Sequence, residues 1–453
     1  MMFERTNVFR WLVVIHVLGL PMIGQAVPNK PGPPQRTPIL LKDVTLHTVS
    51  GEVIEDGQLL FNEGKIQNLG DGSLRINLEE DTEILSLEGH HVYPGMIAAN
   101  SVMGLVEIRA VRATVDVAEP GTLNPNARAE VSFNPDSEII PVTRANGVLS
   151  AMSIPQTRGL ISGQSALMAL DGWTWESMTI KQSVGMHLFW PGMRFLSSTN
   201  ASKEARDNLK KQKKEGAKRL RDLKSFFDRA RAYGARKKEK KEGARTDLRL
   251  EAMLPVLDRK VPLFIHANTL PQIESALSFV SEQKVRMVLV GGQDAWRAAP
   301  LLKAQEVPVI LSPVQSLPLR RWEPHDTPFT NALKLHEAGV LFCIANGGST
   351  FQVANERNLP YQAGAAAAFG LPREEALKSV TLYPARILGV EDRLGSLEEG
   401  KDATFFISDG DPLETRTRIL QAFIQGREVD LSSKHTRLYD KYREKYWQLE
   451  SRE

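Results

Sequence analysis

Residues 93–102, YPGMIAANSV, decide how this chain folds. The Pro-Gly pair is followed by an apolar run, which predicts a short strand that is broken at its end. The residues that follow this run are Asn100, Ser101 and Val102. In barrel enzymes the residues at the carboxyl ends of strands carry the chemistry, so these three positions are the first candidates for a site.

The region from 93 to 390 repeats the same pattern. Apolar runs of strand length alternate with helical stretches, which is typical of a βα barrel. The clearest runs are 261–267, 286–290, 307–311 and 340–344, and helical patterns follow at 272–282 and 296–305. We therefore predict an α/β chain built on a distorted TIM (β/α)8 barrel.

The two ends of the chain have a different pattern. Short β-patterned runs separated by turn residues occupy 39–92, and further strand patterns occur in 391–430. We expect these segments to form one small composite β-sandwich domain, with the barrel inserted between its two parts. Residues 431–453 are expected to form a C-terminal helix.

Four sequence features carry a resemblance to a known family: the strand at 93–97, His266 at the end of the run 261–267, the stretch GSLEEGKDATFFI at 395–407, and TLYPARILG at 381–389. Together they resemble the amidohydrolase superfamily, in particular its imidazolonepropionase-like branch. The resemblance implies a barrel with a metal-dependent hydrolase composite domain. It also implies hydrolysis of C–N bonds other than peptide bonds by a divalent metal, usually zinc.

The metal site implied by the resemblance is largely missing. Where that family has two histidines on the first strand, this chain has Asn100 and Val102. His266 matches the family's third histidine, and Gly291 stands where the next strand should end in a fourth. A valine has no lone pair, and an amide oxygen is a poor ligand for zinc. Asn346 stands where the family has its aspartate base, and an uncharged amide cannot take a proton from water. His266 is the only surviving ligand, so we expect His266 and the degenerate base position Asn346 to mark the site and zinc to be absent.

Other polar residues follow the first strand. Glu107, Arg112 and Asp116 are candidate binding residues, because paired charges are unusual in an apolar framework. Salt bridges on barrel loops would explain them equally well.

Composition and termini indicate an exported globular protein. The chain has 453 residues, of which 42% are hydrophobic and 25% charged. Residues 1–26 have the pattern of a signal peptide, and 27–38 form a proline-rich tether. We expect a periplasmic or extracellular protein without a transmembrane segment after removal of the signal. The single cysteine, Cys343, excludes an internal disulfide.

A basic segment begins at Lys203 and ends at Arg245. It contains 18 Lys or Arg and 7 Asp or Glu, and its apolar residues have helical spacing in its second half. We expect a long helix that lies on the barrel with a basic face in solvent. An anionic surface is one candidate partner for this face and nucleic acid is the least favoured, while a merely solvated face is the simpler interpretation.

Three functions remain open at this point. The first is an inactive or re-purposed barrel, a pseudoenzyme that holds a small-molecule ligand or a partner in its mouth. The second is a divergent hydrolase that uses His266 and the nearby carboxylates without a conventional metal. The third is an exported binding protein for an anionic partner. The lost ligands favour the first, since function resides in the site rather than in the fold. The sequence does not predict the oligomeric state.

Overall fold

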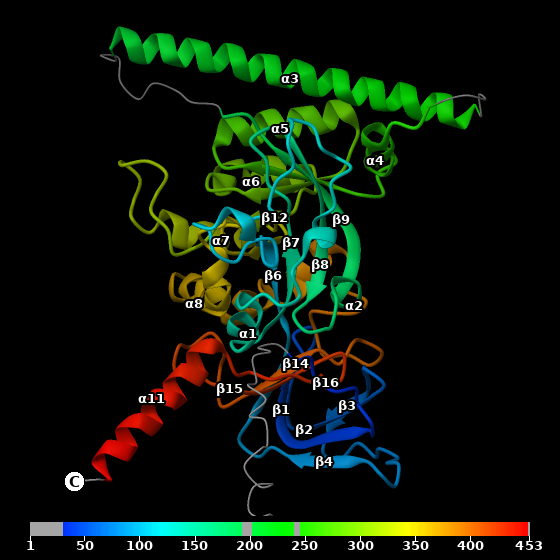
Figure 1. Ribbon diagram of the computed structural model, residues 1–453, viewed down its shortest axis with the longest axis vertical. Coiled ribbons are helices and arrows are strands. Elements are labelled where there is room, and N and C mark those ends of the chain that lie inside the picture. The colour runs from blue at the N-terminus through cyan, green and yellow to red at the C-terminus, as the bar shows by residue number, and fades with distance from the viewer. Residues whose placement is uncertain (1–29, 193–201, 240–244, 452–453) are drawn as a thin grey trace, which may run out of the picture.

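A computed structural model of the chain describes residues 30–192, 202–239 and 245–451. The expected signal peptide, 1–26, lies outside the described residues. Figure 1 shows a barrel body, a second sheet domain below it, and two helices that extend along or away from the body.

The second domain contains one mixed sheet built from both ends of the chain, as Figure 1 shows. Its strand order is β16-β15-β14-β5-β1-β2-β3, and β4 pairs with β1. The strands are β1 (Ile39–His47), β2 (Val53–Asn62), β3 (Lys65–Asp71), β4 (Glu83–Ser86), β5 (His91–Pro94), β14 (Phe405–Ser408), β15 (Ile419–Ile424) and β16 (Arg427–Glu428). Phe61, Phe405 and Phe423 pack edge to face or tilted in its core, with ring centroids 5.1 to 5.2 Å apart.

The other sheet forms the barrel and confirms the predicted fold class. Its order is β13-β12-β11-β10-β9-β8-β7-β6. The strands are β6 (Met96–Ser101), β7 (Val148–Ser153), β8 (Ile161–Ala169), β9 (Thr179–Phe189), β10 (Leu263–Ala267), β11 (Met287–Gly291), β12 (Val309–Leu311) and β13 (Phe342–Ile344). The barrel is distorted because β8 runs antiparallel to both of its neighbours.

A short backbone segment lies between the first and last barrel strands. The amide of Ile97 in β6 donates to the carbonyl of Val380 at 2.9 Å, and the amide of Ile344 in β13 donates to Ser379 at 3.0 Å. The carboxyl ends of β6 and β13 are thereby brought to the same side of the barrel mouth.

Helices cover the barrel and connect its strands. The α-helices are α1 (Ile139–Arg144), α2 (Trp175–Met178), α3 (Lys203–Lys238), α4 (Leu248–Leu257), α5 (Leu270–Gln283), α6 (Ala295–Ala304), α7 (Thr327–Glu337), α8 (Leu359–Ala368), α9 (Arg373–Lys378), α10 (Leu382–Leu388) and α11 (Lys434–Glu450). The described residues also form the 3-10 helices η1 (Arg112–Thr114), η2 (Ala129–Ser132) and η3 (Val353–Asn358). The helices expected at 272–282 and 296–305 correspond to α5 and α6.

The described part of the proline-rich segment lies on the folded body. Pro31 and Gly32 are buried, and the Gly32 amide donates to Asp171 at 3.2 Å. A Cβ atom at Gly32 would lie 2.2 Å from the carbonyl oxygen of Glu428, so only glycine allows this contact. From residue 31 onward, the expected tether is therefore part of the domain.

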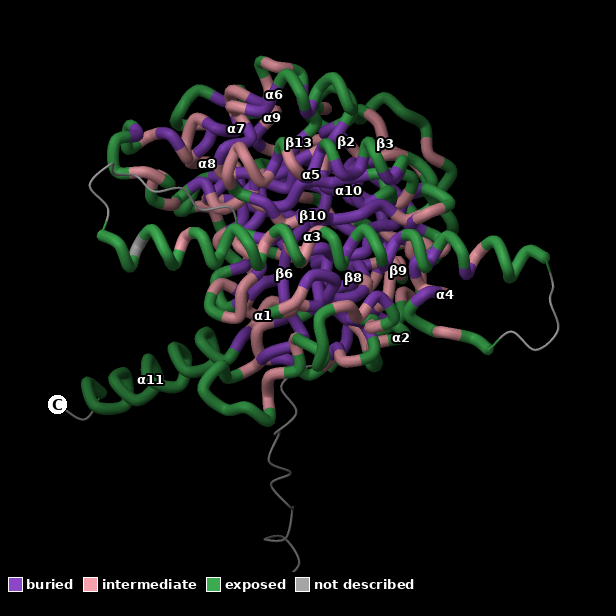
Figure 2. The backbone as a smooth tube through the Cα atoms, turned by 90° about the horizontal axis from the view of Figure 1, so that it is seen from above, coloured by how far each residue is buried: buried purple, intermediate pink, exposed green. Residues whose placement is uncertain are grey.

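Two long helices are exposed, as Figure 2 shows. Helix α3 crosses the barrel side and buries Leu223, Phe226 and Phe227 in its second half, whereas most of its first half is exposed. Helix α11 extends away from the body and buries none of its residues. No helix among the described residues combines the length and the apolar character needed to cross a membrane.

Candidate functional site

The end of β6 holds two of the predicted positions. Asn100 is buried, and its side-chain nitrogen donates to the backbone carbonyl of Asn346 at 3.2 Å. Val102 is completely buried in the barrel core. Gly348 lies directly against Asn100, since a Cβ atom there would be 2.5 Å from the Asn100 side-chain oxygen. A larger side chain at position 100 would therefore require the loop after β13 to move.

A carboxylate that was not among the sequence candidates, Glu356, lies beside Asn346 just after the end of β13. The side-chain nitrogen of Asn346 donates to Glu356 Oε2 at 3.1 Å and to the carbonyl of Asn355 at 3.2 Å. Glu356, in η3, is 1% exposed. Burial raises its pKa to about 7, although hydrogen bonds from Asn346 and Ser101 favour the charged form. Asn100, Ser101, Asn346 and Glu356 form one linked cluster, which we call the amide cluster.

His266 lies at the end of β10 as predicted, but its neighbour is another histidine. Its Nε2 atom is 2.9 Å from Nδ1 of His187, which comes from the adjacent strand β9. Its ring stacks on Phe189 with centroids 4.0 Å apart. Burial lowers the pKa of His266 to about 3 and that of His187 well below its usual value, so both rings are neutral near pH 7.

A metal-ligating side chain does not fit at Gly291, which ends β11. Its φ angle is +101°, a conformation that residues with a side chain rarely adopt. A Cβ atom there would also lie 2.4 Å from the side-chain oxygen of Asn268. The backbone and the neighbours of this position are thus incompatible with a histidine.

The three charged candidates after β6 lie on a loop. Residues 106 and 115 form a bridge in it, and Glu107 is partly buried while Arg112 and Asp116 are exposed. Burial raises the pKa of Glu107 despite hydrogen bonds from Ser137 and Asn134. Within the described residues, Glu107 contacts Asn134, and no hydrogen bond or ion pair joins the three candidates to His266 or to the amide cluster. These residues therefore add charge near the barrel mouth without forming a catalytic group.

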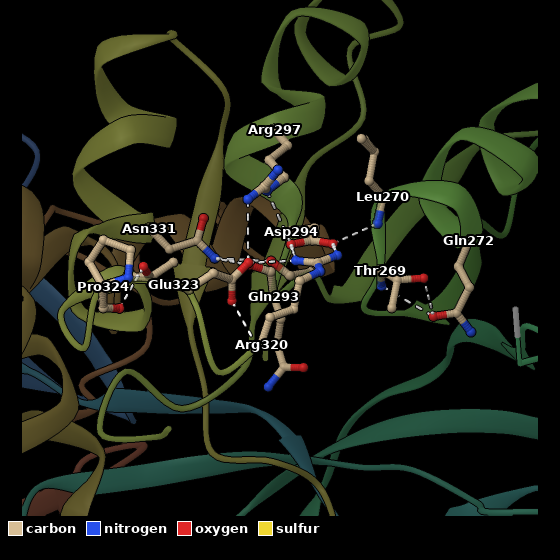
Figure 3. Close-up of polar contacts among 12 residues, drawn as sticks. Thr269, Leu270, Gln272, Gln293, Asp294, Arg297, Arg320, Glu323, Pro324 and Asn331 are labelled. Atoms are coloured by element: carbon tan, nitrogen blue, oxygen red, sulfur yellow. Dashed lines mark hydrogen bonds and ion pairs between the residues drawn. The ribbon is translucent and has the colours of Figure 1, made fainter. Parts of the chain in front are cut away.

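A buried ion network follows β11, as shown in Figure 3. Asp294 pairs with Arg320 at 2.5 Å and with Arg297 at 3.5 Å, and Glu323 pairs with the same two arginines at 2.5 and 3.4 Å. Burial opposes ionisation of Asp294, but hydrogen bonds from Arg320 and the Leu270 amide outweigh it and lower its pKa. The network fixes the segment after β12 against α5 and α6.

A pocket lies beside this network. Residues with amide, hydroxyl and carboxylate groups line it together with apolar neighbours, among them Gln293, Ser312, Val314, Glu323 and Asn331. The side-chain nitrogen of Asn331 donates to the carbonyl of Gly292 at 3.0 Å, while its side-chain oxygen is buried without a hydrogen-bond partner. The lining of this pocket contains no histidine.

The residues at the predicted ligand positions do not fit a zinc ion. Val102 offers no donor atom, Asn100 directs its nitrogen to Asn346, and His266 is hydrogen-bonded to His187. Within residues 30–192, 202–239 and 245–451, no group of three or more His, Cys, Asp or Glu side chains is arranged to hold a metal ion. We therefore derive no metal-dependent step for this chain.

Glu356 and His187 are the two site residues that sequence reasoning missed. Nothing in the sequence connects His187 with His266, because the two are 79 residues apart and share no motif. A prediction that 179–189 forms the strand next to β10 would have placed His187 beside His266. Glu356 lies ten residues beyond Asn346 in a polar stretch, and nothing in that stretch indicates that this one carboxylate is buried.

Comparisons with known proteins agree on one family. Residues 326–434 match the amidohydrolase family. The amidohydrolase tasK of Hapsidospora irregularis is 23% identical over 425 residues, which cover 84% of this chain and 41% of that protein. This chain thus spans about two fifths of the length of that curated relative.

Solved structures extend the similarity over most of the chain. An amidohydrolase from Thermotoga maritima MSB8 superposes with a TM-score of 0.75 at 26% identity, covering 86% of this chain and 99% of that one. The structure of molinate hydrolase matches with a TM-score of 0.53 at 14% identity, covering 89% of this chain and 96% of that one. At 14% identity, the similarity to molinate hydrolase concerns the fold alone.

Proposed function

The chain belongs to the amidohydrolase superfamily, and we propose that it is a re-purposed member that neither binds a catalytic zinc ion nor hydrolyses C–N bonds. The observation that carries this proposal is the amide cluster. At the ends of β6 and β13, where the resemblance requires ligands and a base, Asn100 and Asn346 hydrogen-bond to protein groups instead. The two amide nitrogens are thereby held by protein groups, while Asn100 Oδ1 and Glu356 Oε1 are buried without a hydrogen-bond partner. An amide oxygen is a poor ligand for zinc and, unlike aspartate, cannot take a proton from water.

The alternative of a divergent hydrolase has less support. A histidine with a pKa of about 3 is a weak base at neutral pH, because proton transfer is most efficient when the pKa lies near the working pH. Arg112 and Asp116 are exposed on their loop. Glu356 has a pKa of about 7, which suits a general base, but it is almost fully buried beneath the loop that follows β13.

Metal content tests the proposal. Full-length protein purified after growth with zinc is expected to contain much less than one zinc ion per chain by elemental analysis and to leave a panel of amides intact. The matched variant Asn100→His/Val102→His/Asn346→Asp restores three family residues and omits Gly291, whose backbone excludes a side chain. It should bind more zinc than the parent if Gly348 can move away from position 100.

One tightly bound metal ion per chain in the parent would contradict the proposal. The contradiction would be complete if His266→Ala removed both the metal and an amide-hydrolysing activity, while the protein kept its circular dichroism spectrum. That result would identify ligands other than those the family resemblance indicates.

A basic surface on α3 supports a second proposal, that the protein associates with an anionic partner. Most of the first half of the helix is exposed and carries Lys210, Lys211, Lys214 and Lys218. In the second half, Lys224, Arg231 and Lys237 pair with carboxylates, for example Lys224 with Glu282 at 2.6 Å. Binding to an anionic resin should weaken with salt and decrease when these four lysines become glutamine. Salt-independent behaviour would leave the helix as a solvated face.

A further inference from the structure

Helix α11 has an apolar face that nothing in the described structure covers. It is 17 residues long and begins with a capping box, in which the Ser433 amide donates to Thr436 Oγ1 at 2.8 Å and the Thr436 amide donates to Ser433 Oγ at 3.4 Å. An isolated helix of this length is only marginally stable in water. Its first turn contacts the body through Arg437 and Glu138, 3.9 Å apart, and the rest extends away, as Figures 1 and 2 show.

All the large apolar residues of α11 except Trp447 lie on one side of the helix. Five of them recur at spacings of three or four residues, and we call them the aromatic stripe: Leu438, Tyr439, Tyr442, Tyr446 and Leu449. They are 41%, 65%, 50%, 60% and 50% exposed. Large apolar residues that form a continuous exposed stripe, rather than single exposed positions, indicate an interaction surface.

The charges around the stripe are arranged asymmetrically. At 3.6 residues per turn, Lys434, Lys441 and Lys445 lie along one edge of the stripe, while Asp440 and Glu444 lie on the opposite side of the helix. Asp440 pairs with Arg443 at 3.0 Å, and Glu444 accepts from Gln448 at 2.7 Å. In the described part of the chain, none of the three lysines pairs with a carboxylate. One edge of the stripe thus carries uncompensated positive charge, Asp440 and Glu444 point away from it, and the third carboxylate of the helix, Glu450, lies at the other edge in the last helical position.

We propose that α11 binds an anionic lipid surface, with the aromatic stripe in the interface and Lys434, Lys441 and Lys445 against the headgroups. Apolar and aromatic residues on one face, flanking lysines and a low net hydrophobicity are the properties of helices that lie in the plane of a membrane interface. Tyrosine suits that position because its ring is apolar and its hydroxyl remains hydrated. A second copy of the chain is the poorer occupant, because an antiparallel helix pair would bring the three lysines of each copy together.

Vesicle binding by the full-length protein tests this proposal. The protein should co-sediment with vesicles of phosphatidylcholine and phosphatidylglycerol, and only weakly with phosphatidylcholine alone. The variant Tyr439→Gln/Tyr442→Gln/Tyr446→Gln should bind at least about tenfold more weakly, since glutamine keeps the helix propensity and removes the interfacial rings. The variant Lys434→Gln/Lys441→Gln/Lys445→Gln should lose the preference for phosphatidylglycerol.

Trp447 provides the matched control. It is 63% exposed, but it lies about 140° around the helix from Tyr442 at 3.6 residues per turn. The variant Trp447→Gln should bind vesicles like the parent. Equal binding by the tyrosine variant and the parent would overturn the proposal, as would loss of binding only when the lysines of α3 are replaced. A dimer in solution that the tyrosine substitutions dissociate, without vesicle binding by the parent, would identify a second copy as the occupant instead.

Discussion

At Glu356, burial opposes the charged form of the side chain. Its folded pKa of about 7 exceeds the ordinary value of 4.5, so folding favours the protonated form. Its stabilising contribution is then complete below about pH 4.5 and is lost as pH rises through about 7. We expect the free energy of unfolding to decrease across this window by up to about 3 kcal/mol relative to Glu356→Gln, which cannot ionise. Urea unfolding of both proteins at several pH values measures the difference, and parallel pH profiles would contradict it.

The burial of Glu356 could not be predicted from the sequence. Asn100, His266 and Asn346 could be placed because each follows an apolar strand, and strand ends meet at one side of a barrel. Burial of Glu356 depends on how residues 347–356 fold back across β6, which is a tertiary property. The positive φ of Gly291 could not be predicted either, because glycine is compatible with many backbone conformations.

At the scale of elements, α3 divides into a packed half and a solvated half. Its helical apolar spacing predicted the packed half, and the structure places Phe227 fully buried with its ring 5.2 Å from that of Phe279 in α5. Phe227→Ala should lower the free energy of unfolding by about 3–5 kcal/mol, because it leaves a cavity between the two helices. The control Lys210→Ala, on the exposed half, should change it by less than about 0.5 kcal/mol. Chemical denaturation measures both, and similar small effects would show that α3 adds little to the barrel.

At the scale of the whole molecule, a buried ion cluster joins the barrel to the sheet domain. Arg144 of α1 pairs with Asp171, which follows β8, at 2.9 Å, and Arg427 of β16 pairs with Asp171 at 3.2 Å. The Arg144 side chain also donates to the carbonyl of Asp430 at 2.8 Å. Burial raises the pKa of Asp171 and lowers the pKa of Arg144, so burial disfavours the charged form of both groups. The ion pair between them opposes this cost of burial. Residues 144, 171 and 427 are too far apart in sequence for any local pattern to connect them.

Removing the single carboxylate of this cluster should therefore destabilise both domains together. Asp171→Ala leaves the buried Arg144 guanidinium without its counter-ion, and we expect a loss of about 3–5 kcal/mol in the free energy of unfolding. The double variant Asp171→Leu/Arg144→Met removes the two buried charges and leaves only the more exposed Arg427 unpaired, so it should be closer to the parent than the single variant. As a control, Arg418→Ala breaks an exposed pair with Asp409 and should cost less than about 1 kcal/mol. Equilibrium unfolding monitored by circular dichroism compares the four proteins. A loss below about 1 kcal/mol for Asp171→Ala would contradict this prediction, because leaving a buried arginine without its counter-ion costs more than that. Packing alone would then join the two domains.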